Sequence, residues 1–234
     1  MSSIALTLPA LLLASVIAGR ISAAETSPAD SPVHRVDQSA DRNADRHTDR
    51  TLRVSAEFTD ADLARLHKRP NLTRLDLADS RVTGAGLVHL RALPRLKYLS
   101  LDRTDVDDAA IAHLAALPEL KSLSLNGTKL SDAALSHLAA LPKLQTLALD
   151  GTLVTDAGLI HLRRLKSLEW LYLNETTISD AGLTHLKELK KLKFLSALDT
   201  KVTSSGAAAL QDSLPTVRIR RSNVDDRARG DRSP

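Results

Sequence analysis

The chain of 234 residues contains no cysteine. Disulfide bonds, thiolate catalysis, cysteine-ligated metal centres and a lipoprotein anchor are therefore excluded. Aromatic residues are scarce, because one tryptophan, two tyrosines and two phenylalanines make up 2% of the sequence. Glycine and proline occur nine times each, and none of the glycines forms a phosphate-binding loop motif. The sequence thus lacks the motifs of thiol enzymes and of nucleotide-binding enzymes.

Long hydrophobic runs are also rare. Residues 4–18 are almost wholly apolar, but this length is too short to span a bilayer. Ser22, Ala23 and Ala24 follow as small residues where a signal peptidase cuts. We therefore predict that residues 1–24 are a cleaved signal peptide and that the protein is exported to a periplasm, a cell surface or the medium. The segment has no lysine or arginine before its apolar run, so an uncleaved anchor is the alternative, and it is the only predicted route to a membrane.

Leucine recurs at fixed intervals through the centre of the chain. The stretch 144–167, LQTLALDGTLVTDAGLIHLRRLKS, returns in near-copies that keep the same register and begin at Leu72, Leu96, Leu120, Leu168 and Leu192. Self-similarity at a fixed period of 24 residues predicts an array of one supersecondary unit. One unit alone cannot bury its apolar face, so stability is expected from the stacking of neighbours.

Each unit has two halves. In the first half, Leu147 and Leu149 flank Ala148 with the alternation of a strand. The second half begins with Thr155 and Asp156, a hydroxyl residue and an acid that are typical of a helix start. Leucines along one face of the following segment predict a short amphipathic helix. Each unit is therefore predicted to form one coil of strand, turn and helix.

The pattern L-x-x-L-x-L-x-x-T-x-V followed by T-D-A-G-L-x-H-L resembles the bacterial-type leucine-rich repeat, with threonine where that family usually has asparagine or cysteine. The resemblance covers about residues 48–220. It implies an α/β fold, namely a right-handed leucine-rich repeat solenoid with a parallel β-sheet on the concave side and short helices on the convex side. It also implies that the surface is used mostly to bind other proteins.

The flanking segments differ in composition from the repeats. Residues 25–47 are rich in serine, proline, aspartate and arginine and predict a disordered linker. The leucine-rich repeat domain is predicted at 48–221, as a degenerate cap, six repeats and a final strand around Val217 and Ile219. Residues 222–234 predict a disordered tail, in which Arg229-Gly230-Asp231 resembles the integrin-binding tripeptide. We interpret that tripeptide as a coincidence of composition.

Two polar columns follow the predicted strands. The first consists of hydroxyl residues at the strand exit, Ser80, Thr104, Thr128, Thr152, Thr176 and Thr200. No histidine or lysine holds a fixed position near them to act as a base, so we predict that they bond to backbone groups. The second column is Asp102, Asn126, Asp150 and Asn174. Adjacent strands lie about 4.8 Å apart, which would let this column hold a hard cation weakly, but solvated turn residues are the favoured interpretation.

A third column is formed by histidine and recurs in five of the six repeats, at His89, His113, His137, His161 and His185. Packed helices lie about 8–10 Å apart, whereas ligands of one zinc ion each lie about 2 Å from it. We therefore predict no metal site and a structural role, in which His161 packs its ring and bonds the turn of a neighbouring repeat.

The distribution of charged residues does not indicate a nucleic-acid partner. The formal net charge is +4, and residues 48–216 carry 22 basic and 20 acidic side chains against 6 and 3 in residues 217–234. The predicted solenoid is therefore nearly neutral and presents no phosphate-binding track. Neither a nucleic-acid partner nor a cofactor is predicted.

The few aromatic residues fall in two columns of the predicted sheet. The residues between buried leucines point to the concave surface, and four of the five aromatic residues occupy these positions. We predict an exposed aromatic cluster with a polar rim that binds a protein partner, while the alternative is cross-strand packing that only stabilises the sheet. The predicted partner-binding residues are Trp170, Tyr172, Phe194, Tyr98, Thr146, Glu169, Lys193 and Glu175.

The sequence therefore predicts an exported, non-enzymatic protein-interaction scaffold with no catalytic residues. One alternative is recognition of a cell-wall or surface glycan by the same face, using the aromatic rings and acceptors such as Asp150 and Asn174. A second alternative is a substrate-receptor module of a larger assembly, because the repeats also resemble those that follow an F-box. No such box fits in the linker, and the export signal argues against this alternative.

Overall fold

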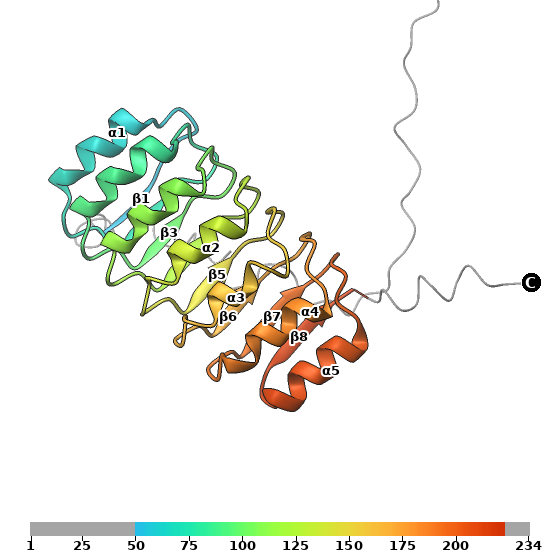
Figure 1. The fold of residues 1–234 in the computed structure, drawn as a ribbon. Coiled ribbons are helices and arrows are strands. Elements are labelled where there is room, and N and C mark those ends of the chain that lie inside the picture. The colour runs from blue at the N-terminus through green and yellow to red at the C-terminus, as the bar shows by residue number, and fades with distance from the viewer. Residues whose placement is uncertain (1–49, 223–234) are drawn as a thin grey trace, which may run out of the picture. The chain divides into compact units, whose positions relative to one another are not determined.

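Buried leucines define the strands of this protein. The computed structural model describes residues 50–222 (Figure 1), and each strand from β2 to β7 has a buried leucine as its second residue. The strands are β1 (Thr51–Arg53), β2 (Arg74–Asp76), β3 (Tyr98–Ser100), β4 (Ser122–Ser124), β5 (Thr146–Ala148), β6 (Trp170–Tyr172), β7 (Phe194–Ala197) and β8 (Arg218–Arg221).

All eight strands form one parallel sheet in sequence order, β1 to β8. From β2 onward each residue pairs with its equivalent in the next repeat, so that Leu75 pairs with Leu99 and Leu99 with Leu123. At the amino-terminal cap Leu52 pairs with Leu75, and this step is one residue shorter than the others. At the other end Ile219 of β8 pairs with Leu195, whereas Val217, which the sequence placed in the same strand, precedes it. The repeat period in the sequence is therefore the coil period of the structure.

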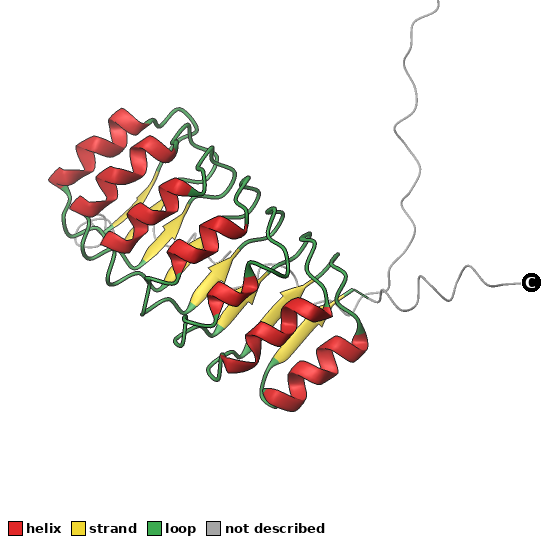
Figure 2. Ribbon diagram, in the orientation of Figure 1, coloured by secondary structure: helices red, strands yellow, loops and turns green. Residues whose placement is uncertain are grey.

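Short helices follow every strand except β8. They are α1 (Asp60–Ala64), η3 (Arg65–Lys68), η4 (Gly84–Ala92), η5 (Ala109–Ala116), α2 (Asp132–Leu138), α3 (Leu159–Leu162), α4 (Asp180–Leu183), η6 (Thr184–Glu188) and α5 (Ser204–Ser213), where η denotes a 3-10 helix. Figure 2 shows that these helices lie on one side of the sheet. The predicted coil of strand, turn and short helix is confirmed.

The core lies between the sheet and the helices. Leu147 from β5, together with Leu159 and Leu162 from α3, has no exposed surface, and the equivalent leucines of the other coils join them in one continuous cluster. Each buried leucine side chain contributes roughly 1.5–3 kcal/mol to folding. Because each coil contacts mainly its neighbours, this contribution depends on the stacking of the array.

At five places a carboxylate joins one coil to the next near the helix start. Asp132 accepts hydrogen bonds from both the amide and the hydroxyl of Thr155, at 2.8 and 2.6 Å. We call this arrangement the clasp. The same pairing recurs at Asp60–Thr83, Asp108–Ser131, Asp156–Ser179 and Asp180–Thr203. The acid therefore does more than favour its own helix dipole, because it also bonds the residue that leads into the helix of the following coil. That residue is the N-cap at Thr83, Ser131, Ser179 and Thr203.

Within residues 50–222, no helix has the length and the apolar character that a bilayer crossing requires. The predicted signal peptide, the linker and the Arg229-Gly230-Asp231 tripeptide lie outside the described residues.

Candidate functional site

Three aromatic rings gather at the carboxyl-terminal end of the sheet. The strand face is the face of the sheet that points away from the helices, formed by the first and third residues of the strands. On it Trp170 pairs with Phe194 across β6 and β7, with ring centroids 5.6 Å apart and planes tilted by 39°. Tyr172 lies at the same centroid distance from Phe194, tilted by 51°. We call Trp170, Tyr172 and Phe194 the aromatic patch.

The three rings of the aromatic patch differ in exposure. Trp170 and Phe194 are half-buried, whereas Tyr172 retains only 7% of its accessible surface. The expectation of a uniformly exposed cluster is therefore wrong for Tyr172, since tertiary packing covers its ring. Thr146, another predicted contact residue, is also buried at 8%. Of the patch, Trp170 and Phe194 are the rings available for contact.

Tyr98 lies apart from the aromatic patch. It is on β3, three strands from β6, which corresponds to about 14 Å at the usual strand spacing. Its ring is 41% exposed, and the Arg74 guanidinium carbon lies 4.5 Å from the ring centroid. This cation–π pair stabilises an exposed site by roughly 0.5–1 kcal/mol. The predicted aromatic residues therefore form two separate groups on the strand face.

Charged residues surround the aromatic patch. Lys193 donates to the Glu169 carboxylate at 2.6 Å, so these two predicted rim residues form an ion pair. Glu175 is exposed at the turn after β6, with a positive φ of 56°. Sequence reasoning omitted Arg218 and Arg220 from the site, although β8 places them opposite Phe194 and Ser196. The constant repeat period was the signal that would have included them.

The hydroxyl column has a structural role. Thr104, Thr128 and Thr152 each donate to the backbone carbonyl three residues earlier, at 2.6–2.7 Å, and the other members do the same at 2.6–2.8 Å. All six side chains are buried. The predicted bonding to backbone groups is confirmed, and these bonds satisfy carbonyls at the strand exit.

The acid–amide column forms a ladder between coils. Asp102 Oδ1 accepts from the Asn126 amide, Asn126 Oδ1 from the Asp150 amide, and Asp150 Oδ1 from the Asn174 amide, at 2.7–2.8 Å. Asn174 Oδ1 then accepts from the backbone of Leu198 at 2.8 Å. Asp102 is buried and the rest are half-buried. The interpretation as solvated turn residues is therefore wrong, because parallel stacking brings each side chain onto the next backbone amide.

The histidine column gives no metal site in the described part of the chain, where no group of three or more potential ligands comes together. His113 is exposed, and His89, His137, His161 and His185 are half-buried along the helices. The predicted hydrogen bond from His161 to a neighbouring turn is not among the side-chain bonds of residues 50–222.

The single parallel sheet, the constant coil period and the buried threonine column define a leucine-rich repeat solenoid. Among solved structures, the chain is similar to internalin C2 from Listeria monocytogenes strain 4b F2365, with 28% sequence identity and a TM-score of 0.58 over 74% of each chain. No protein-family model and no curated protein matched the sequence. The leucine-rich repeat fold is typically used for protein binding and is usually non-enzymatic.

Proposed function

We propose that this chain is an exported, non-enzymatic protein that binds a protein partner on the strand face, with Trp170 and Phe194 as the principal contacts. The supporting observation is the aromatic patch itself. The leucines complete the core without it, yet three of the five aromatic residues of the chain meet there.

The composition of the patch fits a binding hot spot. Half-buried tryptophan and phenylalanine rings rest beside a buried Tyr172, which holds the Phe194 ring in place. The Lys193–Glu169 ion pair and Arg218 supply a polar rim. Hot spots combine large aromatic anchors with such a rim. Cross-strand packing of the same rings would also stabilise the sheet, and the binding experiment below separates the two roles.

The glycan alternative has less support. Its proposed acceptors, Asp150 and Asn174, already accept backbone hydrogen bonds in the ladder. Asn174 Oδ1 also accepts from the Ser196 hydroxyl at 2.7 Å. A sugar hydroxyl would therefore compete with bonds that join the coils. No feature of the described residues favours a substrate-receptor module.

Export rests on the predicted signal peptide at the start of the sequence. If this segment is cleaved after Ala24, the mature protein begins at Glu25, which amino-terminal sequencing of the native protein will show. An intact Met1 on cytosolic protein would contradict export.

The binding test compares two matched aromatic deletions. Trp170→Ala and Phe194→Ala are each expected to weaken partner binding by at least ~2 kcal/mol, which is about 30-fold in Kd. Tyr98→Ala removes an exposed ring from the other end of the same face and serves as the control. Affinity capture from a cell-surface extract with quantitative mass spectrometry, beside a glycan array, measures the effect.

The readout is the set of proteins that the wild-type chain and the Tyr98→Ala variant capture and that neither Trp170→Ala nor Phe194→Ala captures. Circular dichroism must show that each variant remains folded. Equal capture by all four proteins would contradict the site, and a glycan signal that depends on Trp170 would favour the alternative. Tyr172→Ala is not used, because burial of that ring makes a loss of stability the expected result.

A further inference from the structure

The two long edges of the sheet carry opposite charge. Because all strands are parallel, their carboxyl ends and the following helix starts share one edge, while the helix ends and the strand starts share the other. We call the first the acidic edge, formed by residues 53–62, 76–85, 100–109, 124–133, 148–157, 172–181 and 196–205. We call the second the basic edge, formed by residues 63–75, 86–99, 110–123, 134–147, 158–171, 182–195 and 206–219.

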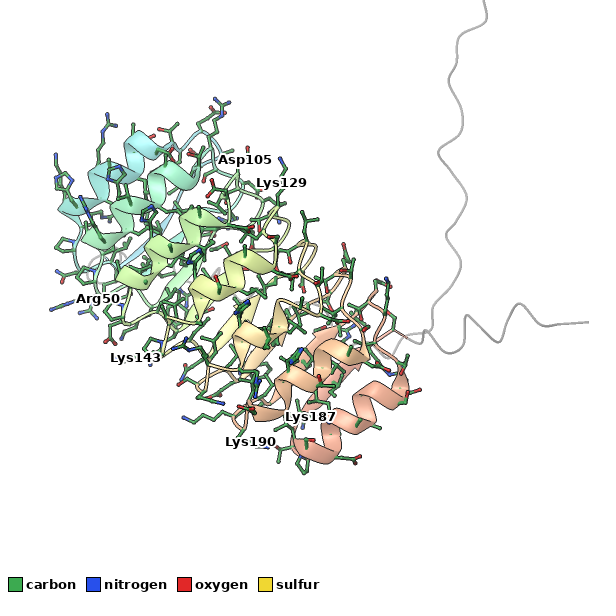
Figure 3. The ribbon with its side chains drawn as sticks, in the orientation of Figure 1. Arg50, Asp105, Lys129, Lys143, Lys187 and Lys190 are labelled. Carbon is green, nitrogen blue, oxygen red and sulfur yellow. The ribbon has the colours of Figure 1, made fainter. Side chains whose placement is uncertain are left out.

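The imbalance at each edge is large. The acidic edge has 15 aspartate or glutamate residues and 5 lysine or arginine residues, a balance of −10. The basic edge has 17 lysine or arginine residues and 4 acids, a balance of +13. Figure 3 shows Lys143 and Lys190 of the basic edge along one long side of the domain and Asp105 of the acidic edge, beside Lys129, along the other. The nearly neutral total of these segments therefore conceals a strongly polar molecule.

Helix dipoles do not remove this separation. Acids near helix starts and bases near helix ends each suit the local dipole. A full helix end carries about half an elementary charge, so the seven coils together supply at most about 3.5 positive charges at the acidic edge. This offsets about a third of the imbalance there, and it leaves a clear excess of negative charge.

Hydrogen bonding inside the domain does not neutralise the edges either. The clasp carboxylates, such as Asp132, accept from an amide and a hydroxyl, which are neutral donors. On the basic edge, three of the four acids already pair with bases, at Glu119–Lys143, Glu169–Lys193 and Glu188–Arg163. Lys187 and Lys191 form no ion pair within residues 50–222. Both edges therefore retain charge that an outside partner can neutralise.

We propose that copies of this chain associate side by side, with the acidic edge of one copy against the basic edge of the next. A second copy fits because both edges belong to the same coils and repeat with the same spacing, about 4.8 Å at the strands. Opposite charges therefore stay matched along the seven segments of each edge, or about 29 Å at the strands. The contact joins two different surfaces, so it leaves one edge of each kind free and builds an open row. A polyanion would use only the basic edge.

The test is sedimentation velocity of the full-length chain at low and high salt. The Debye length is about 30 Å at about 10 mM ionic strength and about 3 Å at about 1 M, so association is expected in the first and should weaken at least about tenfold in the second. The variant Lys187→Glu, Lys190→Glu, Lys191→Glu reverses part of the basic edge and is expected to be monomeric in both. The control Arg81→Glu, Lys129→Glu, Lys201→Glu makes the same charge change on the acidic edge and is expected to keep associating.

A mixing experiment tests the geometry. A third variant, Glu57→Lys, Asp105→Lys, Glu175→Lys, weakens the acidic edge and is expected to be monomeric alone. Mixed with the basic-edge variant, it is expected to form 1:1 dimers and nothing larger, because one intact edge of each kind remains. Monomeric wild-type protein at low salt would overturn the proposal, as would equal loss of association in the basic-edge variant and the control. Association that persists at high salt would also overturn it.

Discussion

Gly84 and Asp107 depart from the repeat together. Gly84 stands where five other coils have the clasp acid, and Asp107 stands where the following coil should have the clasp hydroxyl. A Cβ at Gly84 would lie 2.9 Å from Asp107 Oδ1, and that oxygen instead accepts from the amide of Ala110 at 2.8 Å. The acid and the hydroxyl are therefore one structural unit, present or absent as a pair.

This coupling predicts a non-additive pair of substitutions. In an Ala110→Gly background, which removes the methyl that would lie 2.8 Å from a Cβ at Gly84, the double variant Gly84→Asp, Asp107→Ser should build a sixth clasp. It should raise the free energy of unfolding by roughly 1–2 kcal/mol, because hydrogen bonds to charged groups are the stronger ones. Gly84→Asp alone should be destabilising, since it brings two carboxylates together. Urea denaturation of the parent protein, the two single variants and the double variant measures the coupling free energy between the two positions. If the two single effects simply add, the acid and the hydroxyl do not act as one unit.

The turn after each strand from β2 to β7 contains a residue with positive φ. Gly127 and Gly151 fill this position in two coils, whereas Glu175 and Asp199 hold φ values of 56° and 52° in others. A side chain in this conformation costs roughly 1–2 kcal/mol, which glycine avoids. Glu175→Gly should therefore raise the urea midpoint, with a gain of up to about 1 kcal/mol. Thr177→Gly, two residues further at a position without positive φ, is the control and should lower the midpoint.

The exposed ion pair between Asp79 and Arg103 should make the free energy of unfolding depend on pH. Arg103 donates from Nε and one terminal nitrogen to the two Asp79 oxygens, each at 2.6 Å, and these hydrogen bonds lower the pKa of Asp79. Because the folded pKa lies below the unfolded value of about 3.9, the pair stabilises the fold above that value. Its contribution is lost as the pH falls through the folded pKa.

Asp79→Asn should therefore lower the urea midpoint at pH 7 and have little effect at a pH below both pKa values. The difference should be small, and it should shrink in high salt, because both side chains are more than half exposed. An equal difference at both pH values would show that the pair does not act through ionisation of Asp79.

From the positions of the histidine column we predict that zinc does not change the thermal midpoint of unfolding. Each histidine lies on a separate coil, and no cluster of three potential ligands exists in the described residues. Zinc bound only by the folded state would stabilise it by mass action, so the thermal midpoint should not rise when zinc is added. A zinc-dependent increase that His137→Gln abolishes would contradict the structural role of the column.

Local periodicity determined most of the fold. The leucine period predicts the strands and the coil length, because side-chain burial repeats with the backbone geometry of each coil. The parallel sheet was an implication of the resemblance to leucine-rich repeats, and the structure has it. The same register placed Trp170, Tyr172 and Phe194 on neighbouring strands, and the 5.6 Å ring separations agree with it. That three rings meet is thus a property of the sequence pattern.

The tertiary structure alone decided the contacts between residues that lie about one repeat apart in the chain. Burial of Tyr172, the Asp132–Thr155 clasp and the ladder through Asn126 depend on how neighbouring coils stack. Charge separation has the same origin, because net charge sums over the chain without regard to edge, and parallel strands sort alternating acidic and basic segments onto opposite sides. The sequence determines which residues repeat, while stacking determines what each repeated residue meets.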